Sequence, residues 1–595
     1  MQKNKKLSGV EEKSVVTGIL DIIEEYDVEI FMRDGVILRG SIFRPDTPGK
    51  FPGLLIRTPY GQIGGDIDRL EKRPPHPVNI RDVVRAGYVI MIQDTRGRYT
   101  SDGEYIVNFI ENTGDAEDGY DTVEWLAEQS YCNGKIGTLG ISYNAWMQWQ
   151  LAKLRPPHLK AMCAFSMPIK MADIDWTNGI FRMARRIYWL MNSIAPDMRK
   201  RRGMSKPHTP VEAEEIWNNF PFERWFSFMP WIDFPQYLPE GLAEHVREWF
   251  KNPNSRAWKP AEDIYKEIEV PNLDFSGWYD HCMETMKNLN GMQKNARTET
   301  ARTQTKLIIG PWNHVGLGER KIGDVDFGPL AELNTHDMII RWFDHWLKDL
   351  NNGVEQEPTV RYFVMGAGKW KIADTWPPIG AEKFTYYLDS KGAANEVKNS
   401  GLLLRKIPKE SNCDTYTYDP KDPTPTIWTK EYFTVPSDRN LLDYRQDILR
   451  YRTASLEESI EVVGYPEVVL YASSSAPDTD FFVRLVDEHQ DGTALEICYG
   501  VVRARYRNSL DREELLAPGQ ITQFKIKLGP TACHFLKGHR IRLEIASSDF
   551  PNFDRNHNTG KNDLFDTELV TAHQKIYHSA DYPSQLILEV HNIKN

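Results

Sequence analysis

The sequence lacks any run of about eighteen or more apolar residues along its 595 positions, and a membrane-spanning helix needs about twenty. We therefore expect no membrane partner. Residues 1–16 are rich in Lys and Glu and contain no apolar segment, so we also expect no secretory signal.

Cysteine and positive charge are also scarce. The six cysteines form no CxxC pair and no metal-ligand spacing, so we expect no metal, no cofactor, and reduced thiols in a cytoplasmic protein. The 73 basic and 84 acidic side chains give a net charge of −11, and the one basic run is short, at 199–202. This balance argues against a nucleic-acid partner.

The first 350 residues contain alternating strand and helix patterns. Apolar strands are predicted within 27–45, where Asp34-Gly35 is a hairpin signal, and at 54–57, 88–93, 135–139, 160–165, 272–277 and 306–309. Helices are predicted at 118–129 and 336–350. This alternation predicts an α/β domain with a largely parallel sheet. Residues 167–265 contain many aromatic residues and no convincing strand, which predicts a helical insertion.

The pattern changes after a turn signal at 351–353. Short β-rich runs follow, separated by Pro, Gly, Asp and Asn, at 360–364, 384–388, 467–471, 481–486, 540–545 and 585–590. They predict a β-sandwich. The predicted parts are therefore a tail (1–20), an α/β domain in two pieces (21–166 and 269–353), a helical cap between the pieces (167–268), and the sandwich (354–595).

The segment 135–144 has the layout of a nucleophile elbow. A short apolar strand runs into a sharp turn with Ser142 at its tip, and a helix begins near Tyr143. Such a turn lifts the serine oxygen out of the sheet. The common signature has glycine two positions after the serine, where this chain has Asn144 followed by Ala145.

A serine nucleophile needs a histidine base and a carboxylate that orients the histidine. In α/β-hydrolases these residues occur in the chain order Ser, acid, His, at the ends of late strands. Asp280 follows the strand at 272–277, and His314 follows the strand at 306–309. We therefore predict Ser142, Asp280 and His314 as a catalytic triad.

Other residues fit these roles less well. His281 adjoins Asp280, but the side chains of neighbours on a loop usually point apart. His336 and His345 fall within the closing helix, Asp274 lies inside a strand, and Glu284 lies in the helical stretch that follows.

An oxyanion hole needs two donors directed at the developing charge. The backbone N–H of Tyr143, directly after the nucleophile, is one candidate. The loop at 57–61 follows an early strand, where such hydrolases place the second donor, and it contains Tyr60 in place of a glycine-rich motif. A tyrosine hydroxyl can replace a backbone donor.

Several motifs in order closely resemble the cocaine esterase/X-Pro dipeptidyl-peptidase family, which includes α-amino acid ester hydrolases and glutaryl-cephalosporin acylases. They are Thr-Pro-Tyr at 58–60, Gln-Asp-Thr-Arg-Gly-Arg at 93–98, Ser-Asp-Gly-Glu at 101–104, Trp-Leu at 125–126, Asn-Gly-Lys at 133–135, Gly-Ile-Ser-Tyr at 140–143, Gly-Trp-Tyr-Asp at 277–280 and Gly-Pro-Trp-Asn-His at 310–314.

The resemblance implies an α/β-hydrolase domain with an inserted helical cap and a C-terminal jelly roll. It also implies Ser142 as nucleophile, Asp280 as acid, His314 as base, and Tyr60 with the Tyr143 amide as the oxyanion hole. Asn144 is ordinary for the family, and Ala145 departs from it; its methyl group is expected to crowd the packing of the helix.

The predicted function is ester or amide hydrolysis through an acyl-enzyme, with a bulky apolar or aromatic acyl group. The family's amino-ester hydrolases have acidic residues directly after the catalytic aspartate, where this chain has His281, Cys282 and Met283. This departure argues against amino-ester substrates. The alternatives are X-Pro peptidase activity and acyl transfer to another acceptor, and the one protein partner considered is a second copy in a homodimer. The complete triad argues against a third alternative, a non-catalytic binding role.

Overall fold

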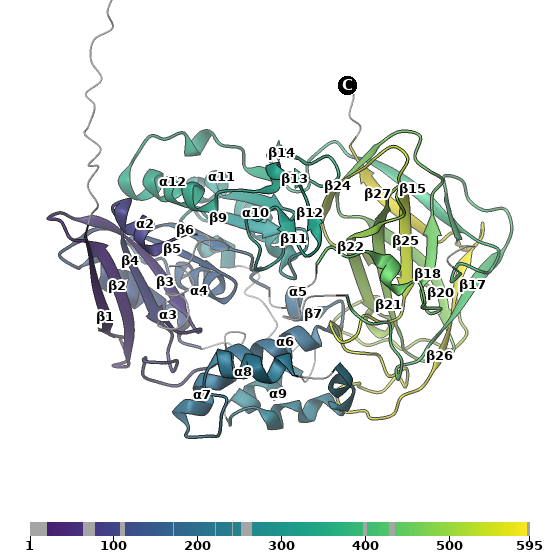
Figure 1. The fold of residues 1–595 in the computed structure, drawn as a ribbon, viewed down its shortest axis with the longest axis horizontal. Coiled ribbons are helices and arrows are strands. Elements are labelled where there is room, and N and C mark those ends of the chain that lie inside the picture. The colour runs from purple at the N-terminus through teal and green to yellow at the C-terminus, as the bar shows by residue number, and fades with distance from the viewer. Residues whose placement is uncertain are drawn as a thin grey trace, which may run out of the picture.

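The computed structural model describes residues 21–62, 78–107, 113–170, 172–219, 222–240, 242–250, 264–396, 401–427 and 435–591. Figure 1 shows a sheet with helices in the first half of the chain, a helical segment beneath it, and a β-rich C-terminal part beside both. Among the described residues, no helix is long and apolar enough to cross a membrane.

Residues 22–373 contain two sheets that meet edge to edge. One has the order β1-β2-β4-β3-β5-β6 and the other β14-β13-β10-β9. Strands β3 to β6, and likewise β9, β10 and β13, pair in parallel. The strands are β1 (Ile22–Phe31), β2 (Ile37–Pro45), β3 (Phe51–Thr58), β4 (Val89–Asp94), β5 (Cys132–Ile141), β6 (Leu159–Phe165), β9 (Leu273–Gly277), β10 (Lys306–Gly310), β13 (Val360–Val364) and β14 (Lys369–Ala373).

The side chain of Asn272 joins the two sheets. Its Oδ1 accepts a hydrogen bond from the Ala164 N–H (2.8 Å), and its Nδ2 donates to the Ala164 carbonyl (3.0 Å). The Ser166 N–H donates to the Phe275 carbonyl across the same junction (2.9 Å). The carboxyl ends of β3, β5, β9 and β10 therefore meet at one edge, where loops from parallel strands build sites.

Helices cover both faces of this combined sheet because adjacent side chains on each strand point to opposite sides. The helices of this domain are α2 (Ile80–Arg85), α3 (Asp115–Ala127), α4 (Tyr143–Ala152), α10 (Met286–Asn295), α11 (Glu299–Gln304) and α12 (Thr335–Lys348). Leu54 and Ile56 pack with α2 and α12, whereas Leu55 packs with α3 and α4.

The predicted insertion is mainly helical between β6 and β9. It contains α5 (Ala172–Asp175), α6 (Met183–Trp189), a π-helical turn (Leu190–Ile194), α7 (Ala195–Arg201), α8 (Pro210–Asn218) and α9 (Leu242–Phe250), with 3-10 turns at Phe222–Ser227, Trp231–Tyr237 and Ile264–Glu267. Sequence reasoning missed one antiparallel pair, β7 (Trp176–Thr177) with β8 (Ile180–Phe181). Two residues per strand are too few to produce a readable alternation.

The C-terminal part is β-rich, so the prediction of an α/β domain followed by a β domain is confirmed. Its strands are β15 (Glu382–Asp389), β16 (Gly401–Leu404), β17 (Asn412–Tyr418), β18 (Leu449–Arg452), β19 (Ile460–Gly464), β20 (Glu467–Ser474), β21 (Asp480–Glu488), β22 (Ala494–Arg503), β23 (Thr522–Lys527), β24 (Thr531–Phe535), β25 (Arg540–Ala546), β26 (Ala572–His578) and β27 (Gln585–Val590). The run 360–364 was expected in this domain, but as β13 it pairs in parallel with β10. A strand's own side-chain pattern does not reveal its pairing partner.

A buried ion cluster joins the C-terminal domain to the insertion. Arg503 contacts the carboxylates of Asp480 (2.9 Å), Asp554 (3.2 Å) and Asp563 (3.0 Å). In turn, the Phe181 N–H donates to Asp554 Oδ1 (3.1 Å). All four members of the ion cluster are buried.

Replacing Arg503 with Met should destabilise the protein by about 3–5 kcal/mol, because it leaves buried carboxylates without their counterion. Chemical denaturation followed by tryptophan fluorescence would measure the loss. Arg512→Met is the matched control, since that side chain is 78% exposed and its loss should change stability by less than about 0.5 kcal/mol. Equal effects of the two substitutions would contradict the argument.

Candidate active site

Ser142 lies in a backbone conformation that a non-glycine residue rarely adopts. Its φ is 59° and its ψ −125°, directly between β5 and α4, and such strain is typical of functional turns. The Ser142 N–H donates to the Phe165 carbonyl (3.1 Å). Its side chain makes no capping hydrogen bond to α4, so the hydroxyl is not used to terminate the helix.

The residues around Ser142 explain the unusual elbow sequence. A Cβ at Gly140 would lie 2.5 Å from Cβ of Asn144, so Gly140 provides the room that the larger Asn144 side chain needs. Ala145 is fully buried within the hydrophobic core of the domain. Its methyl group is therefore part of the packing beneath α4.

Asp280 and His314 are hydrogen-bonded to each other. Nδ1 of His314 lies 2.9 Å from Oδ1 and 3.1 Å from Oδ2 of Asp280, and both residues are buried. Oδ1 of Asp280 also accepts the Cys282 N–H (2.8 Å). The carboxylate therefore holds Nδ1 and fixes the orientation of the His314 ring.

The loops that carry these two residues are bonded directly to each other. The Trp278 N–H donates to the Gly310 carbonyl and the Tyr279 N–H to the Trp312 carbonyl, each at 3.0 Å. A Cβ at Gly277 would lie 2.1 Å from the Trp312 carbonyl oxygen. Glycine at 277 is therefore what allows the two strand exits to approach this closely.

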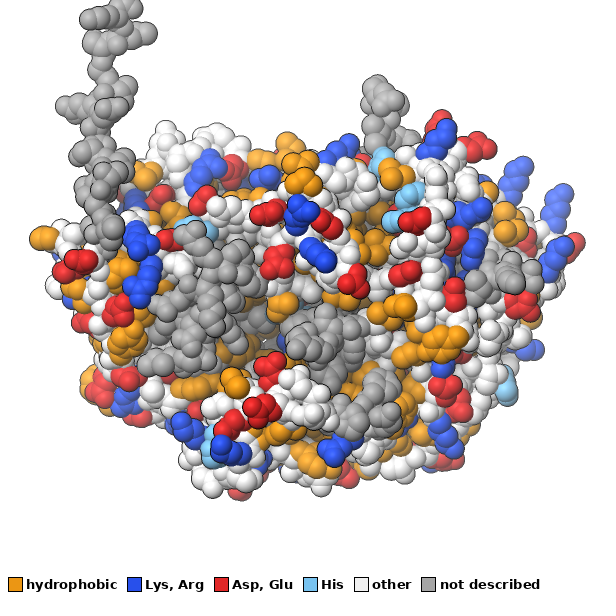
Figure 2. Space-filling model, viewed as in Figure 1, with side chains coloured by type: hydrophobic (Ala, Val, Ile, Leu, Met, Phe, Trp, Pro, Cys, Tyr) orange, Lys and Arg blue, Asp and Glu red, His pale blue; other side chains and the backbone are white. Residues whose placement is uncertain are grey.

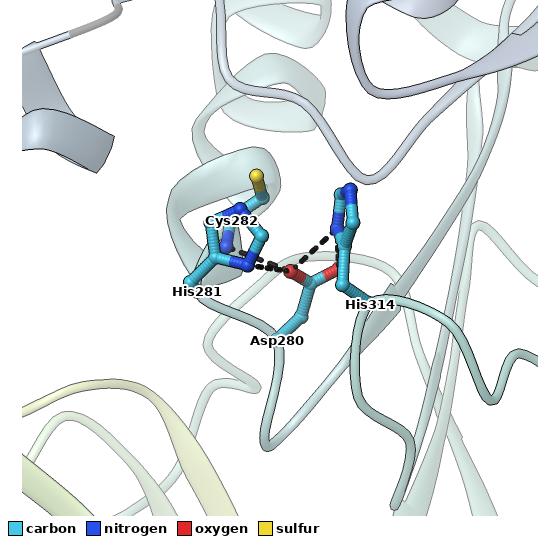
Figure 3. A group of neighbouring side chains, drawn as sticks. All are labelled: Asp280, His281, Cys282 and His314. Carbon is cyan, nitrogen blue, oxygen red and sulfur yellow. Dashed lines mark hydrogen bonds and ion pairs between the residues drawn. The ribbon is translucent and has the colours of Figure 1, made fainter. Parts of the chain in front are cut away.

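His281 does not point away from Asp280, contrary to the expectation for loop neighbours. Its Nδ1 lies 3.5 Å from Asp280 Oδ1, and its ring lies 4.4 Å from the His314 ring, centroid to centroid. Figure 3 shows the Asp280 carboxylate pointing between the two imidazoles. Packing of the ring against His314 outweighs the usual divergence of adjacent side chains.

Four potential metal ligands meet here: Asp280, His281, Cys282 and His314 have ligand atoms within 4.8 Å of one another. Two features disfavour a metal. Burial raises the pKa of the Cys282 thiol well above its usual value, and only the thiolate binds metal well. The Asp280 carboxylate is also already engaged by hydrogen bonds from His314 and Cys282.

A small pocket opens beside Ser142, with about 30 Å³ of free volume, enough for about two water molecules. Its wall combines the α/β domain, the insertion and the loop after Asp280. The lining residues are Tyr60, Ser142, Tyr143, Met167, Ile174, Asp175, Arg185, Arg186, Trp189, His281 and Cys282. Both predicted oxyanion-hole residues therefore line the same pocket as Ser142.

Tyr60 is oriented by the insertion. The indole N–H of Trp189 donates to the Tyr60 hydroxyl oxygen (3.2 Å), so the Tyr60 O–H can donate in turn. Buried Arg98 supports this loop, because its Nε donates to the Pro59 carbonyl (2.9 Å) and its Nη1 to the Ile194 carbonyl (2.8 Å).

The other residues considered from the sequence have different contacts. Asp274 is buried within β9, and Glu284 pairs with Lys287 (3.2 Å). Nδ1 of His336 lies 3.4 Å from the Asn79 N–H, and Nδ1 of His345 lies 3.1 Å from the Leu350 carbonyl.

Sequence reasoning missed the supporting residues Arg98, Trp189, Arg185 and Arg186. The spacing of Arg182, Arg185 and Arg186 along a helix could have indicated a cationic face. Nothing local indicated that Arg98 would reach the Pro59 carbonyl, or that Trp189 would reach Tyr60 from the insertion.

Comparisons with known proteins agree with this architecture. Residues 34–316 match the family model of the X-Pro dipeptidyl-peptidase (S15 family), and residues 352–587 match the X-Pro dipeptidyl-peptidase C-terminal non-catalytic domain. The chain is 32% identical to cocaine esterase of Rhodococcus sp. (strain MB1 Bresler), over 95% of this chain and 98% of that protein.

Two solved structures share the fold. An aminopeptidase from a marine sediment archaeon, Thaumarchaeota archaeon, has a TM-score of 0.79 at 22% identity, and the match covers 99% of this chain and 100% of that one. An α-amino acid ester hydrolase labelled with selenomethionine has a TM-score of 0.77 at 24% identity, with the same coverage.

The fold and these matches define a serine hydrolase of the α/β-hydrolase class. More particularly, the chain belongs to the cocaine esterase/X-Pro dipeptidyl-peptidase family, as its motifs predicted.

The protonation state of His281 can be tested through the pH dependence of hydrolysis. Burial lowers the pKa of His281 well below its usual value, and the neighbouring His314 and arginines add to the effect. A histidine with a lowered pKa stays neutral from weakly acidic to alkaline pH, so His281 should not titrate in the working range.

We therefore expect His281→Phe to leave the midpoint of the acid limb of kcat/KM against pH in place, whatever its effect on the height of the profile. His314→Gln should instead abolish the measurable profile. Steady-state hydrolysis of a 4-nitrophenyl ester between pH 5 and 9 would test this expectation. A displaced midpoint in His281→Phe would contradict the expectation that His281 stays neutral in this range.

Proposed function

We propose that this chain hydrolyses carboxylic esters through an acyl-enzyme on Ser142. The observation that carries the proposal is the hydrogen-bonded pair of Asp280 and His314, 2.9 Å apart; His281 and Cys282, directly after Asp280, line the same pocket as the strained Ser142. The orienting carboxylate, base and nucleophile come from the ends of β9, β10 and β5, in the order that α/β-hydrolases require.

In the proposed mechanism His314 accepts the Ser142 proton as the serine oxygen attacks the ester carbonyl. Asp280 holds the ring in the correct tautomer and stabilises its positive charge. The Tyr60 hydroxyl and the Tyr143 N–H donate to the oxyanion. Tyr143 begins α4, and the first N–H groups of a helix have no intrahelical acceptor. His314 then protonates the leaving alcohol, and water releases the acid in a second, equivalent step.

The pocket wall supports an apolar acyl group, because Tyr60, Met167, Ile174 and Trp189 contribute much of it. A bulky or aromatic acyl group, as the sequence predicted, would require the wall to open beyond its free volume of about 30 Å³. We propose that the insertion serves as a cap over this pocket and that the C-terminal domain is a jelly roll.

X-Pro peptidase activity is the second candidate, since the matched family model has that name. A peptide amino terminus needs a carboxylate partner. Positions 281–283 supply none, and the pocket carboxylate Asp175 is already paired with Arg186 (3.0 Å). Ester hydrolysis therefore fits the site better. Acyl transfer would use the same residues and would differ only in its acceptor.

The proposed location is the cytoplasm, supported by the six free thiols. The proposed partner is a small-molecule ester. In Figure 2 basic and acidic side chains are interspersed over the visible face, which gives a nucleic acid no basic track on that face. One chain supplies every residue of the proposed site, so a homodimer is not needed for catalysis.

Ser142→Ala should lower ester hydrolysis by about 10⁴-fold or more while the fold is retained, because no other group replaces the nucleophile. A fluorophosphonate probe should label the native protein and not the variant, as intact-mass spectrometry would show. Labelling that persists in the variant would overturn the assignment.

In parallel, a 4-nitrophenyl ester should be cleaved faster than an X-Pro 4-nitroanilide; the reverse preference would support the peptidase.

Tyr60→Phe should lower kcat by about 10²–10³-fold with little change in KM, because it removes a donor that acts mainly on the transition state. Tyr188→Phe is a matched control, since Tyr188 lies on α6 outside the lining of the pocket. An equal effect of the two substitutions on kcat would argue against Tyr60 as an oxyanion donor.

A further inference from the structure

A cluster of three potential metal ligands lies in the C-terminal domain. Asp487 is part of β21, His489 directly follows that strand, and His539 directly precedes β25. Their ligand atoms lie within 4.8 Å of one another, and none of the three residues lines the pocket beside Ser142. The two histidines are far apart in the sequence, so no local spacing motif could indicate the cluster.

Both imidazole rings face the Asp487 carboxylate. Nδ1 of His539 lies 2.9 Å from Oδ1, and Nε2 of His489 lies 3.4 Å from Oδ2. The two rings are stacked, with centroids 4.5 Å apart and planes at 28° to each other. In a tetrahedral zinc site with bonds of about 2.0–2.1 Å, neighbouring ligand atoms are about 3.3 Å apart. The two measured separations bracket this value, so small side-chain rotations would bring the three groups onto one ion.

The Asp487 carboxylate has no permanent cation beside it. Its side chain is only 4% exposed, yet no lysine or arginine among the residues that the structure describes pairs with it, and its hydrogen bond and ion pairs go to the two histidines. The next carboxylate along β21, Glu488, pairs with Arg452 instead (3.1 Å).

A buried carboxylate needs a compensating charge. A divalent ion would supply that charge to Asp487 and engage both rings at once. Protons on both rings would instead place two like charges in a stacked pair, which is unfavourable.

The two segments that carry the histidines are fixed to each other. Nε2 of Gln490 donates to the Lys537 carbonyl (3.1 Å), and a Cβ at Gly538 would lie 1.8 Å from the same nitrogen. Strands β21 and β25 pair directly and lie side by side (Figure 1). The ligands are therefore held at the ends of two paired strands, which is the kind of support that a precise site needs.

We propose that Asp487, His489 and His539 form a binding site for a divalent transition metal ion of the zinc type. Imidazole nitrogen and carboxylate oxygen are ligands that Zn²⁺ takes, whereas Mg²⁺ and Ca²⁺ prefer oxygen alone. Three protein ligands leave a fourth position for water. The side chains of His489 and His539 are 32% and 12% exposed, so the ion can enter from solvent. This site is separate from the ester hydrolysis proposed at Ser142.

Isothermal titration calorimetry of the full chain, without an affinity tag and after dialysis against a chelator, tests the proposal. Zn²⁺ should bind with at least about 100-fold higher affinity than Mg²⁺. His489→Gln and His539→Gln should each weaken zinc binding by about 100-fold or more, because the loss of a residue that only supports a ligand already costs about 10- to 100-fold. Both rings are partly exposed, so the variants should fold; far-UV circular dichroism would check this.

Two control variants exclude the other histidines. His573→Gln removes an exposed ring of the same domain, which bonds to Thr417 (3.1 Å), and His281→Phe removes a ring from the ligand cluster beside the proposed triad. Neither substitution should change the affinity for zinc. In a crystal soaked with zinc, anomalous scattering at the zinc absorption edge should place the ion between Asp487, His489 and His539.

The proposal is overturned if Zn²⁺ binds no more tightly than Mg²⁺, or if either His489→Gln or His539→Gln keeps the native affinity. It is also overturned if His281→Phe alone lowers the affinity, since the ion would then lie next to Asp280. The readout is metal binding and not hydrolysis, so none of these results bears on the proposed esterase. Ser142→Ala should bind zinc as the native protein does.

Discussion

The arrangement of the site depends on one backbone contact, the close approach of the chain where β9 and β10 end. Two hydrogen bonds of 3.0 Å, from Trp278 N–H to the Gly310 carbonyl and from Tyr279 N–H to the Trp312 carbonyl, join the exits. They place Asp280 and His314 within hydrogen-bonding distance. The C-terminal domain secures this contact, because the Tyr279 hydroxyl donates to the Glu496 carbonyl (3.0 Å). Strand β13 of the same sheet adds a bond from the Trp278 indole to the Phe363 carbonyl (2.8 Å). That domain therefore supports the loop of Asp280 mechanically, although it contributes no side chain to the pocket lining among the described residues.

The strained backbone of Ser142 is also held by contacts with its surroundings. A positive φ at a non-glycine residue costs on the order of 1–3 kcal/mol, so the surrounding structure must hold it. The bond from the Ser142 N–H to Phe165 and the fully buried Ala145 on α4 supply that support. Gly140 leaves space for Asn144, which explains how this elbow tolerates a larger side chain where the common signature has glycine.

Much of the fold and part of the site could be predicted from the sequence because they depend on local patterns. The strands ending near Ser142, Asp280 and His314 are short apolar runs, and parallel strands bring their ends together whatever the loops contain. The pairing of β13 with β10 could not be predicted, because the side-chain pattern of a strand does not identify the strand that pairs with it. The contact of His281 with His314 could not be predicted either, because it depends on loop conformation. The supporting residues Arg98 and Trp189 act across a domain junction that no local pattern encodes.

The surroundings of the arginines near the pocket also could not be predicted from the sequence. Arg182, Arg185 and Arg186 are close in sequence, yet their environments differ. Arg182 donates to the Tyr499 hydroxyl and to Asn552 in the C-terminal domain, Arg186 is neutralised by Asp175, and Arg185 lines the pocket. Three arginines within five positions of the chain therefore have three different surroundings, and only the packing of the insertion against the pocket and the C-terminal domain distinguishes them.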